Sequence, residues 1–225
     1  MGGGIHYRNN FDRRWSLKTS LLYQQVEAWD ADSEDPFIRN RNLSFRNQVI
    51  EGSLQFELNF FPYQIGERQY PATPYVFAGL GYFNMKPMAN YRGTWYELQP
   101  LGTEGQGTAL GGDYYKTNML CVPFGVGFKV NIFSVFAFNL EWGVRKTWTD
   151  YFDDISGNYV DTGALAETSG PLAAALADRS LVKETDNGSS IPTLQRGDPG
   201  RKDFYFFALA SLTFRIDKKA TSCWK

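Results

Sequence analysis

The sequence has few of the residues on which catalytic and metal sites depend. Its 225 residues include one histidine, His6, and two cysteines, Cys121 and Cys223. One histidine excludes chemistry that needs two, and two cysteines are too few for a disulfide scaffold or a zinc site. Cys121 lies in an apolar stretch, which predicts a buried thiol. We expect no cofactor.

An excess of charge of one sign is also missing, as are long apolar runs. Lysine and arginine number 23 against 24 acidic residues, so no basic field attracts nucleic acid. A transmembrane helix needs about 18 consecutive apolar residues. The longest runs, Met119–Phe128 and Val130–Leu140, are shorter and are separated by Lys129. Hydropathy alone would indicate a soluble protein, but the strands of membrane barrels carry only a weak hydropathy signal.

The dominant pattern is an alternation of apolar and polar residues with a period of two. It is clearest in Arg14–Gln24, Ile50–Phe60 and Phe136–Thr147, and a period of two predicts strands with one apolar face. Further strands are expected around Gly4–Asn10, Pro74–Tyr91, Leu120–Val130 and Phe204–Ile216. Several of these segments exceed the usual length of soluble strands, about 5–6 residues, and match the length of strands that cross a bilayer.

The connections alternate between short and long. Long connections are expected at 30–46, 93–115 and 151–202, and shorter ones at Asn10–Arg13, Pro62–Thr73 and Asn131–Ser134. Outer-membrane barrels have tight periplasmic turns and extended outer loops. The sequence therefore predicts an antiparallel up-and-down transmembrane β-barrel over residues 1–216. Residues 217–225 would form a C-terminal tail in the periplasm.

About seven strands are visible, whereas bacterial single-chain barrels have an even number. We therefore expect eight strands in the complete protein, with the first strand and a signal peptide preceding residue 1. The apolar faces would contact lipid, and the opposite faces would fill the interior of a barrel without a channel. Charges there should pair, because an isolated buried charge is costly. The expected interior charges are Arg14, Lys18, Glu51, Glu57, Lys129, Glu141, Arg145 and Arg215.

Other candidate sites fall mainly in the loops. The carboxylates of Asp150, Asp153, Asp154 and Asp161 could hold Ca²⁺, which takes several oxygen ligands, although a solvated polar loop is the commoner explanation. The glycine-rich segment 101–107 has no Lys-Ser/Thr partner, so it indicates a flexible or a fixed loop and not a phosphate site. Ser169 and Pro171 predict the start of a short helix over Pro171–Arg179.

Several segments of the sequence resemble, in the same order, segments of the PorG-like outer-membrane proteins of the type IX secretion system of Gram-negative bacteria. They are Arg41–Arg46, Pro74–Gly81, Leu98–Gly107, Pro123–Gly125 and Glu141–Asp154. The resemblance implies an eight-stranded, non-enzymatic barrel in the outer membrane that assembles or anchors the secretion machinery. It further implies contacts between the periplasmic side and a ring formed by a lipoprotein and its partner. The turns at Asn10–Arg13, Pro62–Thr73 and Asn131–Ser134 and the C-terminal tail are the inward-facing candidates for those contacts.

Three alternatives remain open. One is a small outer-membrane adhesion or envelope-anchoring barrel without a secretion role. Another is a lipid-modifying outer-membrane enzyme in which His6 serves as the base for a nucleophile. The last is a soluble carrier of the lipocalin kind, which would need an apolar cavity where charged faces are expected.

Overall fold

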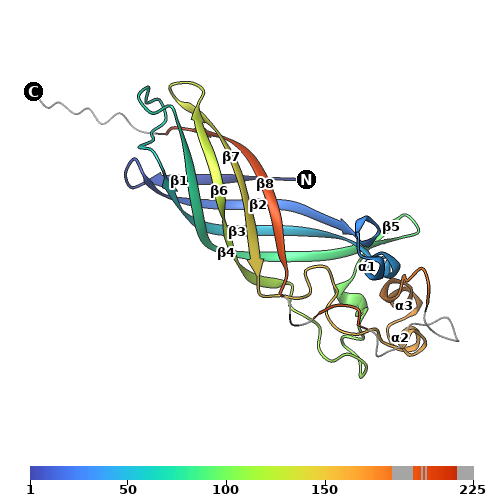
Figure 1. Ribbon diagram of the computed structural model, residues 1–225. Coiled ribbons are helices and arrows are strands. Elements are labelled where there is room, and N and C mark those ends of the chain that lie inside the picture. The colour runs from blue at the N-terminus through green and yellow to red at the C-terminus, as the bar shows by residue number, and fades with distance from the viewer. Residues whose placement is uncertain (184–194, 199, 201, 217–225) are drawn as a thin grey trace, which may run out of the picture.

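The fold is a single antiparallel sheet that curls into a barrel-like shape. A computed structural model describes residues 1–183, 195–198, 200 and 202–216 (Figure 1). The strands are β1 (Gly2–Asn10), β2 (Trp15–Trp29), β3 (Ser44–Asn59), β4 (Ala72–Tyr91), β5 (Thr94–Glu97), β6 (Asn118–Asn131), β7 (Phe136–Thr147) and β8 (Phe204–Phe214). This all-β, antiparallel architecture confirms the predicted fold class.

The main strands pair in the order β1-β2-β3-β4-β6-β7-β8, and β5 pairs only with β4. Every pairing is antiparallel, and the longest registers run without a break, as between β2 and β3 from Trp15 opposite Leu58 to Trp29 opposite Ser44. Within the described part of the chain, β1 and β8 are not paired with each other. The sheet therefore remains open along these two edges.

The alternation in the sequence corresponds to the two faces of the curled sheet. In β3, Glu51, Gln55 and Glu57 are buried, whereas Leu54 and Phe56 between them are more than half exposed. The same arrangement holds in β2, β6 and β7. Side chains of successive residues in a strand point to opposite faces, so the polar residues fill the interior and the apolar residues cover the outside.

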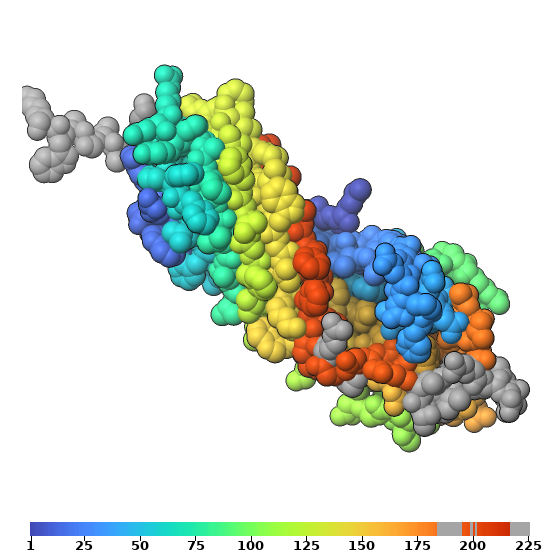
Figure 2. All heavy atoms as spheres, viewed as in Figure 1, coloured from blue at the N-terminus to red at the C-terminus, as the bar shows by residue number. Residues whose placement is uncertain are grey.

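The longer connections lie at one end of the sheet and the short turns at the other (Figure 1). The long connections contain the 3₁₀ helices η1 (Asp30–Asp32) and η2 (Gln99–Leu101) and the helices α1 (Pro36–Arg41), α2 (Thr162–Thr168) and α3 (Pro171–Ala177). In the space-filling view these connections form a bulky mass at the end of the barrel (Figure 2). We call this mass the cap and the opposite end the turn end.

The helices of the cap are short and have local start signals. Asp35 accepts a hydrogen bond from Phe37 N and Pro36 occupies the first turn of α1, and Asp161 caps α2 by accepting from Ala164 N. A capping oxygen and an N-terminal proline both favour a helix start. The helix predicted to begin at Pro171 is confirmed as α3, two residues shorter than expected, whereas α1 and α2 were not predicted.

Candidate functional site

A network of buried charges fills the barrel toward the turn end. Glu57 accepts hydrogen bonds from Arg8 Nε at 2.8 Å and from Lys129 Nζ at 2.6 Å. Lys18 Nζ donates to Glu141 at 2.6 Å and lies 3.8 Å from Glu57. None of these side chains is more than 7 % exposed. Because each carboxylate contacts at least two cations, the network pairs the buried charges as predicted.

A second ion pair lies closer to the cap. Arg145 donates two hydrogen bonds to Glu51, from Nε at 3.0 Å and from Nη2 at 3.2 Å. The guanidinium also lies over the ring of Phe207, 3.5 Å from its centroid. Cys121 is a buried free thiol next to Glu51, which confirms the prediction of a buried thiol. Cys223 lies outside the described residues.

Six of the eight predicted interior charges are therefore inside the barrel, and two are not. Arg14 is exposed in the turn before β2, where it donates to Phe60 O. Arg215 is exposed after the end of β8 and donates to Ile65 O. Both predictions were wrong because the alternation of residue types continues beyond the last paired residue. Arg8 was missed, although it is in phase with Lys18, which lies opposite it in the β1–β2 register.

His6 lies on β1 with its side chain partly buried. Its Nε2 is 3.1 Å from Thr213 Oγ1 of β8, and its partner in the β1–β2 register is Ser20. The Ser20 hydroxyl is in turn 2.7 Å from Ser53 Oγ. These side chains point into the polar interior and not toward the outer apolar face, where a lipid substrate would lie.

The four aspartates considered for Ca²⁺ are not brought together. Asp150 accepts from Ser156 Oγ, Asp153 accepts from Ile155 N, and Asp161 caps α2. Asp154 accepts from Thr103 Oγ1 and Tyr115 Oη. In the described part of the chain, no cluster of three or more His, Cys, Asp or Glu residues is placed to hold a metal ion. Asp150 and Asp153 instead bind residues of their own connection, Asp154 binds the connection before β6, and Asp161 binds its own helix.

The cap is held together by Arg196, a residue that the sequence pattern did not single out for this role. Its guanidinium is buried and donates to Glu104 Oε1 at 2.8 Å, Asp154 O at 2.6 Å and Ala177 O at 3.2 Å. Its own carbonyl accepts from Arg41 Nη1 at 2.7 Å. These contacts join all three long connections, so the cap is a folded unit.

The glycine-rich segment 101–107 is a fixed part of this unit. Residues Gly102 to Gln106 are buried, and Glu104 accepts hydrogen bonds from the backbone of Ser156 and Gly157 as well as from Arg196. A Cβ at Gly102, which has a φ of 61°, would lie 2.4 Å from Gln106 O. The glycine is therefore required by both its conformation and the close approach of the backbone.

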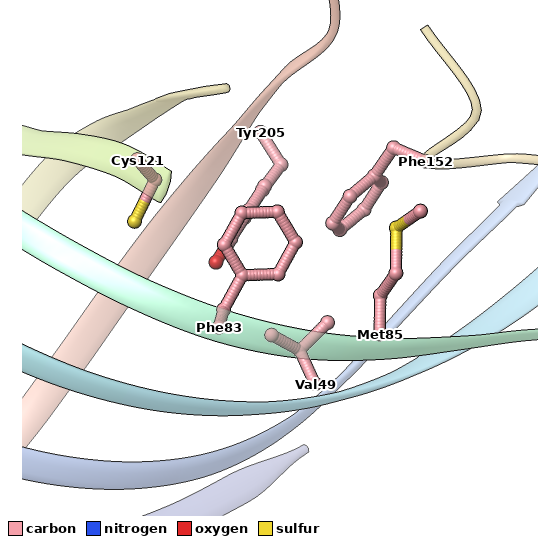
Figure 3. Packing of buried hydrophobic residues seen from close by; sticks show 6 residues of the cluster. All are labelled: Val49, Phe83, Met85, Cys121, Phe152 and Tyr205. Atoms are coloured by element: carbon pink, nitrogen blue, oxygen red, sulfur yellow. The ribbon is translucent and has the colours of Figure 1, made fainter. Parts of the chain in front are cut away.

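Phe152 closes the interior from the cap side. Its ring stacks on Tyr205 with centroids 4.8 Å apart and meets Phe83 and Phe45 edge to face. Figure 3 shows the ring directed toward Phe83, Met85 and Tyr205 from the connection after β7. Asn47 Nδ2 donates to the carbonyl of Phe152 and Asp203 accepts from its amide. The ring therefore acts as an apolar plug above the charged network.

Burial raises the pKa of several carboxyl groups in the cap. The pKa of Asp154 rises to about 6 because the group is buried, although the nearby charge of Arg196 opposes the shift. The pKa of Asp153 rises to about 8 through burial and the negative charge of Asp203. The pKa of Asp203 itself rises to about 6, again mainly through burial. Protonation of these groups near neutral pH therefore favours the folded cap.

A cleft of about 510 Å³ lies between β1 and β8 at the turn end. Its lining includes His6, Arg8 and Asn9 from the β1 side and Thr213 and Arg215 from the β8 side. Lys129 of the buried network also reaches it. The cleft is thus the place where the open edges of the sheet give access to the charged interior.

These features define a class: an all-β, barrel-like protein with a charged interior, an apolar exterior and a structured cap. None of the helices in the described residues is long and apolar enough to cross a lipid bilayer. Residues 1–166 match the family described as Domain of unknown function (DUF6089), so the chain belongs to this family. No curated protein and no solved structure matches the chain.

Proposed function

We propose that the protein is a non-enzymatic β-barrel of the bacterial outer membrane that assembles or anchors the type IX protein secretion machinery. In this proposal the outer face contacts lipid, the cap faces the cell exterior, and the turn end faces the periplasm. The partners are periplasmic ring components, a lipoprotein and its associated protein.

The apolar exterior is the observation that carries the membrane assignment. Every main strand exposes large apolar side chains on its outer face, including Ile5, Leu21, Tyr23, Ile50, Leu54, Phe56, Leu80, Tyr82, Leu120, Val126, Trp142, Phe206 and Leu212. Soluble monomers rarely expose a continuous apolar patch of more than a few hundred Å². In a bilayer the same surface is favourable, and the charges that pair in the interior are kept away from lipid.

The orientation is supported by the different lengths of the connections. Bacterial outer-membrane barrels have short periplasmic turns and long extracellular loops, and the present chain separates the two kinds at opposite ends (Figure 1). The predicted periplasmic tail, 217–225, lies outside the described residues. The predicted turns Asn10–Arg13, Pro62–Thr73 and Asn131–Ser134 all connect strands at the turn end.

The secretion role is supported by the resemblance to PorG-like proteins. Three of the five segments that carry this resemblance reach the cap, where Arg41, Glu104 and Asp154 all contact Arg196. A shared, folded cap explains why these loops carry distinctive sequence, since their buried polar groups must find specific partners.

The test is purification of the complete gene product from its native envelope in mild detergent, with co-purifying proteins identified by mass spectrometry. We expect recovery in the outer-membrane fraction together with periplasmic ring components. Recovery there without these partners would leave only the adhesion or anchoring barrel. Recovery as a soluble periplasmic protein would overturn the membrane assignment.

A matched pair of variants tests which end binds the partners. Arg68 and Arg39 are both exposed, Arg68 at the turn end between β3 and β4 and Arg39 in α1 of the cap. Arg68→Glu should reduce co-purification of the ring components, whereas Arg39→Glu should leave it unchanged. Equal loss in both variants would contradict the proposed orientation.

A further inference from the structure

The cap contains a groove of about 440 Å³ between two of its long connections (Figure 1). One wall comes from the segment 104–111 before β6 and the other from the segment 151–161 after β7. The two walls are fixed to each other, because Glu104 accepts hydrogen bonds from the backbone amides of Ser156 at 2.9 Å and Gly157 at 3.1 Å. Small-molecule sites are largely pre-formed and have volumes of about 300–1,000 Å³. The groove therefore has the size and the fixed walls of such a site.

Part of the lining is apolar. Leu110 is 39 % exposed at the groove, and Val160 beside it is partly buried. Tyr151 also lines the groove, and its ring is held by stacking on Tyr115 with centroids 4.5 Å apart. An aromatic ring with a hydroxyl at its tip offers both apolar contact area and a hydrogen bond. This part of the groove suits a ligand with a C–H surface.

The other part of the lining is polar and exposed. Asn158 and Asp161 both lie there with exposed side chains. The amide of Asn158 can donate and accept hydrogen bonds. Asp161 uses one of its two carboxylate oxygens to cap α2, by accepting from Ala164 N at 2.7 Å. A ligand at this position therefore meets both donors and acceptors.

The charges of the lining favour a neutral ligand. Among the described residues, no lysine, arginine or histidine lines the groove, whereas phosphate and sulfate groups are recognised mainly by such cations. Glu104 is already paired with Arg196 at 2.8 Å, so Asp161 alone remains to attract a cation. A single exposed carboxylate gives little binding energy to an ion pair.

We propose that this groove of the cap is a binding site for a neutral saccharide. The hydroxyl groups of a sugar both donate and accept, which matches Asn158 and Asp161, and its C–H faces match Leu110 and Tyr151. A purely aliphatic ligand would leave the polar lining without partners, which is unfavourable for groups removed from water. The proposal is separate from the proposed secretion role and from the orientation in the membrane.

Binding of soluble oligosaccharides to the complete gene product tests this site. The protein would be purified in an amine-oxide detergent, because a maltoside or glucoside head group would compete for the groove. It would then be applied to an array of neutral glycans and of their sulfated and phosphorylated forms. We expect retention on a subset of the neutral glycans and binding of their anionic forms that is several-fold weaker. Titration calorimetry with the best neutral glycan then gives the affinity.

Two matched pairs of variants locate the site. Leu110→Trp should fill the groove and lower the affinity several-fold, whereas Phe37→Trp, at an exposed position of α1, should leave it unchanged. Asp161→Asn keeps a capping oxygen for α2 and should weaken binding several-fold, whereas Glu34→Gln, also exposed in the cap, should not. Limited proteolysis of the cap would confirm that each variant is folded.

Retention of no neutral glycan, or a preference for the anionic forms, would overturn the proposal. Equal affinity in Leu110→Trp and the unaltered protein would also overturn it, because binding would then lie elsewhere. The assay uses neither the membrane nor secretion partners, so its failure is distinguishable from failure of the proposed function.

Discussion

Lys18 Nζ lies 2.6 Å from Glu141 Oε1 inside the barrel, although 123 positions separate the two residues in the chain. The contact joins β2 to β7 across the interior, and Tyr75 of β4 donates to the same carboxylate oxygen at 2.7 Å. Strands that are not neighbours in the sheet are thus connected through polar side chains.

Removal of the charge of Glu57 should strongly destabilise the barrel. Glu57→Gln leaves Arg8 and Lys129 buried without their shared carboxylate, and breaking a buried pair costs about 3–5 kcal/mol. The measurement is the free energy of unfolding in detergent micelles. As a control, Glu27→Gln disrupts the more exposed pair with Arg46 and should cost about 1 kcal/mol or less. Equal losses would show that the interior network is not a principal source of stability.

Truncation of the plug should loosen the cap end of the barrel. Phe152→Ala removes the ring that packs on Tyr205, Phe83 and Phe45 and should cost about 3–5 kcal/mol. Hydrogen exchange should rise in the segments around Phe152 and Tyr205. Phe37→Ala, at an exposed position of α1, provides the control and should change neither stability nor exchange. Unchanged exchange in Phe152→Ala would contradict the role of this ring as a plug.

The cap should become more stable as the pH falls. Asp153 has a folded-state pKa of about 8, well above its usual value, so its contribution is complete below the unfolded pKa and is lost as the pH rises toward 8. Asp154 and Asp203, each with a pKa of about 6, act in the same direction. Limited proteolysis of the cap should therefore be slower at pH 5 than at pH 8.

Asp153→Asn isolates the contribution of this group to the pH dependence. The amide stays neutral at all pH values, so the change in protection between about pH 6 and pH 8 should largely disappear. Asp161→Asn, which keeps a capping oxygen at the start of α2, serves as the control and should retain the full pH dependence. A cap that is more protected at pH 8 than at pH 5 would contradict the assigned pKa shifts.

The three hydrogen bonds that the Arg196 guanidinium donates should be essential to the stability of the cap. Arg196→Lys keeps the charge but cannot reach Glu104, Asp154 and Ala177 at once, because an ammonium lacks the planar donor geometry of a guanidinium. We expect faster hydrogen exchange in all three long connections. The effects of Arg196→Lys and Glu104→Gln on stability should be non-additive in a double-mutant cycle, since they remove the same contact. Additive effects would show that the two side chains act independently.

The barrel itself was predictable because its signal is local. Alternating residues place Glu51 and Glu57 on one face of β3 and Leu54 and Phe56 on the other, and a period of two has no other explanation in regular structure. The same reasoning wrongly placed Arg14 and Arg215 in the interior. Residue types continue to alternate in the turns, so the pattern does not mark where pairing ends.

The cap was less predictable because its contacts are not local. The start of α3 was predictable from Ser169 and Pro171. The hydrogen bonds of Arg196, however, join it to Glu104, 92 positions away in the chain, and to Arg41, 155 positions away. No periodicity connects such residues. Arg41 and Glu104 lie within segments that resemble the PorG-like proteins, whereas Arg196 does not, and the resemblance did not indicate which side chains would meet.

The assembly of the cap from three distant connections has a consequence for the order of folding. Ordering a long segment of chain costs more entropy than closing a hairpin, so Arg196 can reach Glu104 and Asp154 only once β4, β6 and β7 are in place. We therefore expect the cap to become ordered after these strands. Until then its connections are accessible to proteases outside the sheet, and molecules with incompletely paired strands would be cleaved there first. Resistance of the cap to proteolysis should therefore report whether all strands of the sheet have paired.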